Sequence, residues 1–118
     1  MSGTVRIDDN KLVFELHGID MILSIRRTLS VPLDHVSSVS TEKVQWQPFH
    51  QIKVVGASIP GIIKDGIFLS DDGILFFEMH DPEKCVTVSL NHERFKKIVF
   101  EVQDKEDSAK MIRDALAK

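Results

Sequence analysis

Apolar and polar residues alternate in short runs along most of the chain, which predicts a mainly β protein. Residues 5–7 alternate until the turn-forming sequence Asp8-Asp9-Asn10 ends the segment. Residues 12–16 and 21–25 are both rich in apolar side chains, and they flank His17-Gly18-Ile19-Asp20. Two such runs around a short polar loop predict a β-hairpin.

A further strand is predicted around residue 31. Leu29, Val31 and Leu33 alternate with polar residues and Pro32, so one face of this strand should lie in a core and the other in water. Proline has no backbone N–H to give to a neighbouring strand. We therefore expect an edge strand, or a bulge, at Pro32.

Similar runs fill the second half of the chain. Residues 67–69 and 74–79 flank Ser70-Asp71-Asp72-Gly73, a turn signal because Asp and Gly tolerate positive φ. After a second turn at 80–84, residues 85–90 and 97–102 alternate as half-buried antiparallel strands do. Residues 44–47 are a weaker strand candidate, and the glycine-punctuated segment from Gly56 to Gly66 is expected to be a loop.

The last stretch, about 105–117, changes to a helical period. Asp104 can cap the start of the helix, Glu106 and Asp107 suit its positive first turn, and Lys118 lies near its negative end. An apolar face that needs a partner surface follows at helical spacing: Ala109, Ile112, Ala115 and Leu116. The expected architecture is a small antiparallel barrel or sandwich with one terminal helix.

Length and charge limit the class of protein. The 118 residues suit a single domain, 1–118, with strands over about 4–102. No signal peptide or membrane-length apolar run is recognisable, so we expect a cytoplasmic protein. A formal charge of −3 argues against a nucleic-acid partner held by bulk electrostatics. One cysteine, Cys85, cannot form an internal disulfide.

The order of these elements resembles that of bacterial pleckstrin-homology-like (PH-like) domain proteins. The resemblance covers about residues 12–116, and is carried by the run 56–61 followed by Gly66, the turn 80–84, the strand Val86-Thr87-Val88 and the closing helix. It implies a bent antiparallel barrel of about seven strands, with one open end covered by the helix. It supplies no catalytic residues.

Phosphoinositide binding is not expected even with a PH-like fold. PH domains that bind these lipids place Lys and Arg around the first hairpin loop, whereas residues 17–20 offer no permanent cation and carry one carboxylate. Arg26 and Arg27 lie on the far side of the following strand. Phosphate recognition needs several such donors converging on one point.

No catalytic, metal or cofactor motif is recognisable. Cys85 could be a nucleophile only beside a histidine, and neither His80 nor His92 is held near it by the sequence. The five histidines are scattered, without metal-ligand spacing. Adjacent aspartates at 8–9 and 71–72 fit turns better than acid–base chemistry. We therefore expect no enzyme and no cofactor.

The candidate contact surface is apolar: Trp46, Phe49, Ile59, Pro60, Ile62 and Ile63. Exposed together, these residues would mark an interaction site, whereas folded back they would close one end of the barrel. The first functional hypothesis is a non-catalytic module that binds another protein or a second copy of itself. The second is a peripheral membrane module, with Ile62 and Ile63 inserting and Lys64 touching head groups. A ligand-binding or enzymatic role of Cys85, His80 or His92 is the third.

Overall fold

The computed structural model describes residues 3–15, 28–44, 51–59, 63–71 and 73–118, and for 51–59 and 63–65 it describes the backbone only. These residues form two β-sheets and one α-helix, α2 (Lys105–Leu116). The small sheet has the order β1-β2-β3, made of Thr4–Asp8, Lys11–Glu15 and Thr28–Pro32. The large sheet has the order β4-β8-β9-β7-β6-β5. Its strands are Val36–Ser40 (β4), Gln51–Ile59 (β5), Ile63–Ser70 (β6), Gly73–Met79 (β7), Cys85–Leu90 (β8) and Lys97–Glu101 (β9).

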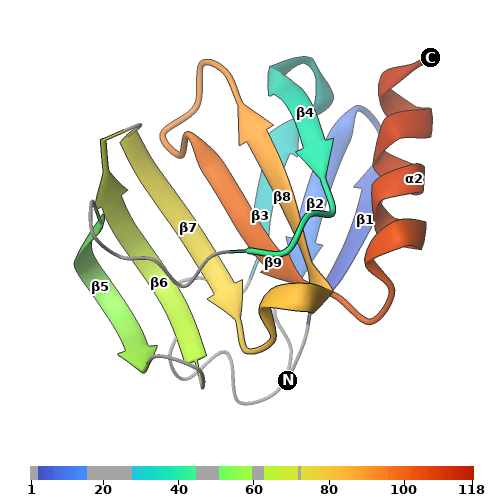
Figure 1. Cartoon of the computed structure of the whole chain (residues 1–118). Helices are drawn as coiled ribbons and strands as arrows, with labels where there is room; N and C mark the ends of the chain where they lie inside the picture. Colours follow the sequence, from blue (N-terminus) through green and yellow to red (C-terminus); the bar gives the residue numbers. More distant parts are fainter. Residues whose placement is uncertain (1–2, 16–27, 45–50, 60–62, 72) are drawn as a thin grey trace.

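The two sheets lie one over the other, and α2 runs along one side of them (Figure 1). Half of the large sheet, β4, β8 and β9, covers the small sheet, while β5 and β6 extend beyond it. Helix α2 packs against β4, β8 and β1, and against the short 3₁₀ helix η1 (Leu33–His35) that joins the sheets. One core is built from both sheets and α2, with Phe14, Phe76, Phe100 and Ile112 fully buried.

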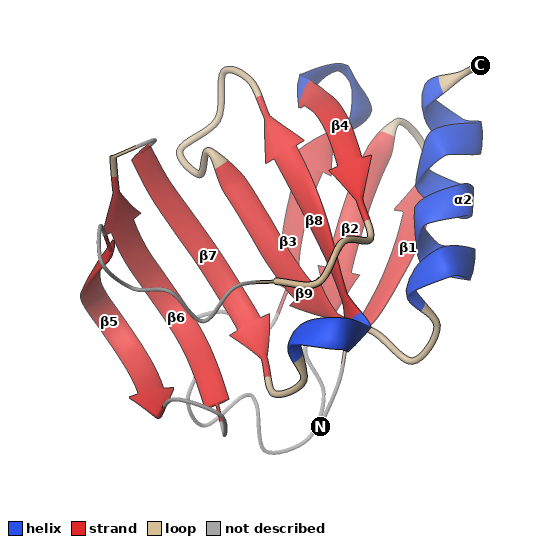
Figure 2. Ribbon diagram, viewed as in Figure 1, coloured by secondary structure: helices blue, strands red, loops and turns tan. Residues whose placement is uncertain are grey.

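Strand β9 is inserted between β7 and β8, although it follows both in the sequence. It pairs parallel with β7, through Phe76↔Ile98, and antiparallel with β8, through Val88↔Ile98. The connection from β7 to β8 contains the 3₁₀ helix η2 (Pro82–Lys84) and passes across the end of β9 (Figure 2). The centre of the large sheet is therefore completed by a strand from late in the chain.

A second apolar cluster lies on the opposite face of the large sheet. It contains Phe68, Leu75, Phe77, Met79, Cys85 and Val99, and the half-buried Val44 packs against it. The expectation of a half-buried β9 was therefore wrong: Ile98 and Phe100 lie in the first core, and Val99 lies in the second. Burial on both faces follows from the central position of this strand.

Several expectations are confirmed. The chain is mainly β with one C-terminal helix, and Asp104 caps that helix by accepting a hydrogen bond from the Asp107 N–H at 3.0 Å. The turn between β6 and β7 is present, with Gly73 at φ 128°. Leu29 and Val31 are buried on β3, which is an edge strand of the small sheet with one neighbour among the strands described.

Other expectations were wrong. The two sheets are not closed into the barrel that the resemblance implied, which leaves the other expected architecture, a sandwich of two sheets. Nine strands rather than about seven are present in the part of the chain described. The segment from Gly56 to Gly66 is largely the β5–β6 hairpin, in which Gly56 pairs with Gly66. Glycine weakens a strand but does not prevent one, and here the pairing between β5 and β6 forms despite the glycines. The loop 17–20 and the candidate strand residues 45–47 lie outside the residues described.

Candidate functional site

The predicted contact surface cannot be assembled from the residues described. Trp46, Phe49, Pro60 and Ile62 lie outside them. For Ile59 and Ile63 the backbone is described, and these two residues form the last pair of the β5–β6 ladder. They are thus residues of paired strands and not of the long loop expected from the sequence.

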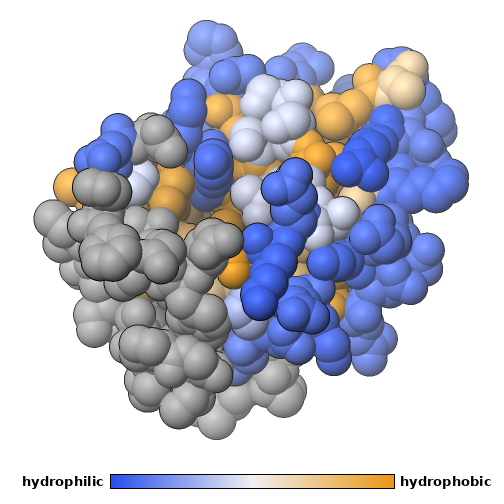
Figure 3. Space-filling view, viewed as in Figure 1, coloured by the Kyte–Doolittle hydropathy of each residue, from blue (hydrophilic) through white to orange (hydrophobic). Residues whose placement is uncertain are grey.

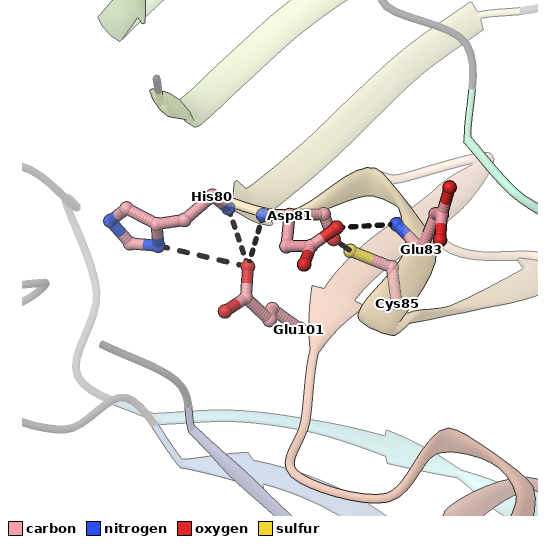
Figure 4. A network of polar contacts seen from close by, with 5 residues as sticks. All are labelled: His80, Asp81, Glu83, Cys85 and Glu101. Atoms are coloured by element: carbon pink, nitrogen blue, oxygen red, sulfur yellow. Dashed lines mark hydrogen bonds and ion pairs between the residues drawn. The ribbon is translucent and has the colours of Figure 1, made fainter. Parts of the chain in front are cut away.

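Cys85, His80 and Glu101 do come together, at the crossing of the β7–β8 connection over β9 (Figure 4). The buried Glu101 carboxylate accepts hydrogen bonds from the backbone N–H groups of His80 and Asp81, both at 2.6 Å. Asp81 in turn caps η2 by accepting from the Glu83 N–H at 2.9 Å. Glu101 therefore fastens the crossing by satisfying two backbone donors.

These contacts do not activate the thiol. Cys85 is fully buried, and its Sγ lies 3.5 Å from the carbonyl oxygen of Asp81, to which the thiol donates. Burial raises the pKa of Cys85 well above its usual value, and the nearby carboxylates of Glu101, Glu78 and Asp81 raise it further. The His80 ring extends from Glu101 on the side away from Cys85, with Nδ1 3.8 Å from Glu101 Oε1 (Figure 4). A nucleophilic thiol needs the opposite environment.

A histidine pair lies at the other end of β8. His35 Nδ1 is 2.5 Å from Glu93 Oε2, and the rings of His35 and His92 are 5.9 Å apart. The Asn91 N–H also donates to the His35 carbonyl at 2.7 Å, so the β8–β9 loop is joined to η1. Among the residues described, no group of three or more His, Cys, Asp or Glu side chains could hold a metal ion.

An open groove runs between α2, η1 and the β1–β2 turn. It has a volume of about 910 Å³, and is called the α2 groove below. Its apolar lining comes from four segments of the chain: Ile7, Leu33, Val36, Met111, Ala115 and Leu116. All of these except Val36 are half-buried. In the space-filling view, hydrophobic surface gathers between β4 and the C-terminal part of α2 (Figure 3).

The rim of the α2 groove is charged and mostly acidic. Its charged residues are all exposed: Asp9, Asp34, Asp107, Lys110, Asp114 and Lys118. Four carboxylates against two ammonium groups leave a net charge of −2. The Nζ of Lys110 is bound to Asp114 at 2.8 Å, a contact that raises the pKa of Lys110.

Local contacts hold the walls of the groove in place. Asp9 adopts φ 56° in the β1–β2 turn, and the carbonyl of the next residue, Asn10, accepts a hydrogen bond from the Leu33 N–H at 2.8 Å. The Arg113 guanidinium donates to the Val39 carbonyl at 3.2 Å and so ties α2 to β4. The groove is therefore bounded by three elements that are joined to one another or to the core.

The sequence indicated part of this groove. Ala115 and Leu116 were expected on the helix face that needs a partner surface, and the structure leaves both of them half-buried at the groove. The contributions of Leu33, Asp34 and Met111 were missed. The signal available for Met111 was its spacing, four residues after Asp107 and four before Ala115, which places all three along one line of the helix.

No family model matches this chain, and neither do the curated proteins or the solved structures compared with it. Among the described residues, no helix is both long and apolar enough to cross a bilayer.

Proposed function

We propose that this protein is a non-catalytic interaction module of the PH-like kind that its sequence resembles, and that it binds another protein through the α2 groove. The observation that carries the proposal is the apolar lining of an open groove. Ile7, Leu33 and Leu116 pack against the main core from its outer side and remain half-buried. A partner that covers them would bury apolar surface worth about 25 cal/mol per Å².

The polar clusters support this proposal indirectly, because each has a structural role. Glu101 fastens the β7–β8 connection, and His35 with Glu93 joins η1 to the β8–β9 loop. Burial raises the pKa of the Cys85 thiol, which disfavours the nucleophilic thiolate. The membrane alternative has less support, since the rim of the α2 groove is acidic and would repel anionic head groups.

Site-specific photo-crosslinking in the producing cell tests the proposal. A benzophenone amino acid would replace Ser37, an exposed residue of the α2 groove, or Lys84, an exposed residue of η2 that does not line it. We expect discrete adducts of higher mass from position 37 and none of the same mass from position 84. An adduct of twice the chain mass would identify the partner as a second copy. No adduct from position 37, or the same adducts from both, would overturn the proposal.

A further inference from the structure

We infer that the α2 groove binds a cationic amphipathic peptide segment of a partner protein, with aliphatic side chains on the floor of the groove and Lys or Arg side chains at its rim. The inference rests on the proposed function and adds the chemistry of the partner. Three features of the groove favour such a segment: its shape, its apolar floor and the charge of its rim.

The floor selects for aliphatic side chains. Leu33 comes from η1, and Met111 and Ala115 come from α2; Ala115 leaves space because its side chain is a single methyl group. None of the three is fully buried. Helix α2 has 12 residues, so this wall is about 18 Å long at 1.5 Å per residue. That length matches a segment of about three helical turns or a shorter extended peptide.

The rim selects for positive charge. Lys110 is already bound to Asp114, which leaves Asp9, Asp34 and Asp107 with only Lys118 as a cation on the same rim. Asp34 lies on η1 and Asp107 on the first turn of α2, so carboxylates come from both walls. A segment lying between them would meet negative charge on two sides, which favours Lys and Arg and repels phosphate.

The same charges disfavour the other occupants. Anionic lipid and nucleic acid would be repelled by the rim. A second copy of this chain carries a formal charge of −3, so its approach is opposed at low ionic strength. A cationic segment of a different protein is the occupant that both the floor and the rim favour.

The test uses two designed peptides of about three helical turns, one of leucine and lysine and one of leucine and glutamate in the same pattern. Each is titrated into the whole protein at low and at high salt, and amide chemical shifts report the site. We expect the lysine peptide to bind, to shift groove amides such as those of Ser37 and Met111, and to weaken with salt. The glutamate peptide should not bind.

Charge variants make the test specific. In Asp34→Asn/Asp107→Asn the lysine peptide should bind roughly fivefold more weakly at low salt. The control is Glu42→Gln/Glu106→Gln, which removes two exposed carboxylates that do not line the groove, one of them beside Asp107 on the same helical turn. The control variant should bind the lysine peptide as tightly as the parent protein does. Met111→Gln should weaken binding of this peptide, because it makes the floor of the groove more polar.

Three results would overturn the inference. The first is equal binding of the two peptides, and the second is no binding of the lysine peptide. The third is binding of the protein to vesicles of phosphatidylglycerol and phosphatidylcholine, measured by sedimentation, that the lysine peptide prevents. If crosslinks from position 37 are nevertheless found, the groove binds a partner of different chemistry and the proposed function stands. If those crosslinks are absent, the proposed function itself fails.

Discussion

At the scale of single residues, Glu101 explains why Cys85 and His80 lie close to a buried carboxylate. Its carboxylate is buried at the end of β9, directly opposite Cys85 in the β8–β9 ladder. Its Oε1 accepts from two consecutive backbone N–H groups of the connection that crosses this strand end. Buried backbone donors must be paired, and a charged acceptor pairs them strongly. These hydrogen bonds thus hold the β7–β8 connection against the end of β9.

The raised pKa of Cys85 leads to a prediction about its reactivity. In the folded protein, iodoacetamide should label Cys85 far more slowly than an exposed thiol throughout about pH 7 to 9, because the side chain is buried and very little of it is thiolate there. An ordinary thiol, with a pKa near 8.5, is largely ionised by pH 9, so its rate begins to level off there. Peptide mass spectrometry after timed labelling measures the rate at each pH.

A second thiol in the same molecule is the control for this prediction. Ser30→Cys places a cysteine on the exposed face of β3, and its labelling should rise with pH as that of Cys85 stays low. In urea the two thiols should react alike. Labelling of Cys85 as fast as that of position 30 in the folded protein, with the same levelling towards pH 9, would show that the thiol is accessible and ionises normally.

At the scale of elements, α2 depends on its N-terminal cap. Asp104→Ala removes the side chain that accepts from the Asp107 N–H, and we expect the free energy of unfolding to fall by about 1 kcal/mol. Urea denaturation followed by circular dichroism measures the change. Asp104→Asn keeps a capping oxygen and should stay close to the parent protein. Equal losses in the two variants would mean that the charge of Asp104, and not its hydrogen bond, stabilises the helix.

Elements with strong local signals could be predicted from the sequence. The helix has a cap and a regular apolar face, and the β6–β7 turn has residues that tolerate positive φ. Strand β4 was missed because its sequence, Val36-Ser37-Ser38-Val39-Ser40, has few apolar residues. It forms by pairing with β8, a strand about 50 residues away, and no local pattern reports such a contact.

The α2 groove could not be predicted from the sequence for a similar reason. Its lining comes from the β1–β2 turn, η1, the start of β4 and α2, which are widely separated in the chain. Only the helical part of the lining could be seen in the sequence, because Ala115 and Leu116 belong to the apolar residues that repeat at helical spacing. The contact surface expected from the sequence consisted instead of an apolar loop, 59–63, together with Trp46 and Phe49.

At the scale of the whole molecule, the two sheets meet closely at Gly3. The Gly3 N–H donates to the Glu101 carbonyl at 3.2 Å, just beside the start of β1. A β-carbon at this position would lie 2.2 Å from the Glu15 carbonyl oxygen and 2.4 Å from Cζ of Phe100. Phe100 itself packs edge-on against Phe14, with the ring centres 5.2 Å apart. Any side chain at residue 3 would therefore separate the sheets.

We predict that Gly3→Ala lowers the free energy of unfolding by about 1–3 kcal/mol, because added atoms in a packed joint force the sheets to shift. Thermal and urea denaturation measure the loss. The adjacent Thr4→Ser keeps the hydroxyl of an exposed residue and should change stability by no more than about 0.5 kcal/mol. A Gly3→Ala protein as stable as this control would show that the joint is loosely packed.

The insertion of β9 between β7 and β8 has a consequence for synthesis on the ribosome. Translation delivers Gly73–Met79 and Cys85–Leu90 before Lys97–Glu101, so the nascent chain holds two apolar strands that cannot yet be joined. At about 5–20 residues per second, the interval between Leu90 and Glu101 is about one second. Until β9 pairs with both strands, the facing edges of β7 and β8 have no neighbour in the sheet. The last strand of the described chain to be made is thus the one that closes the large sheet.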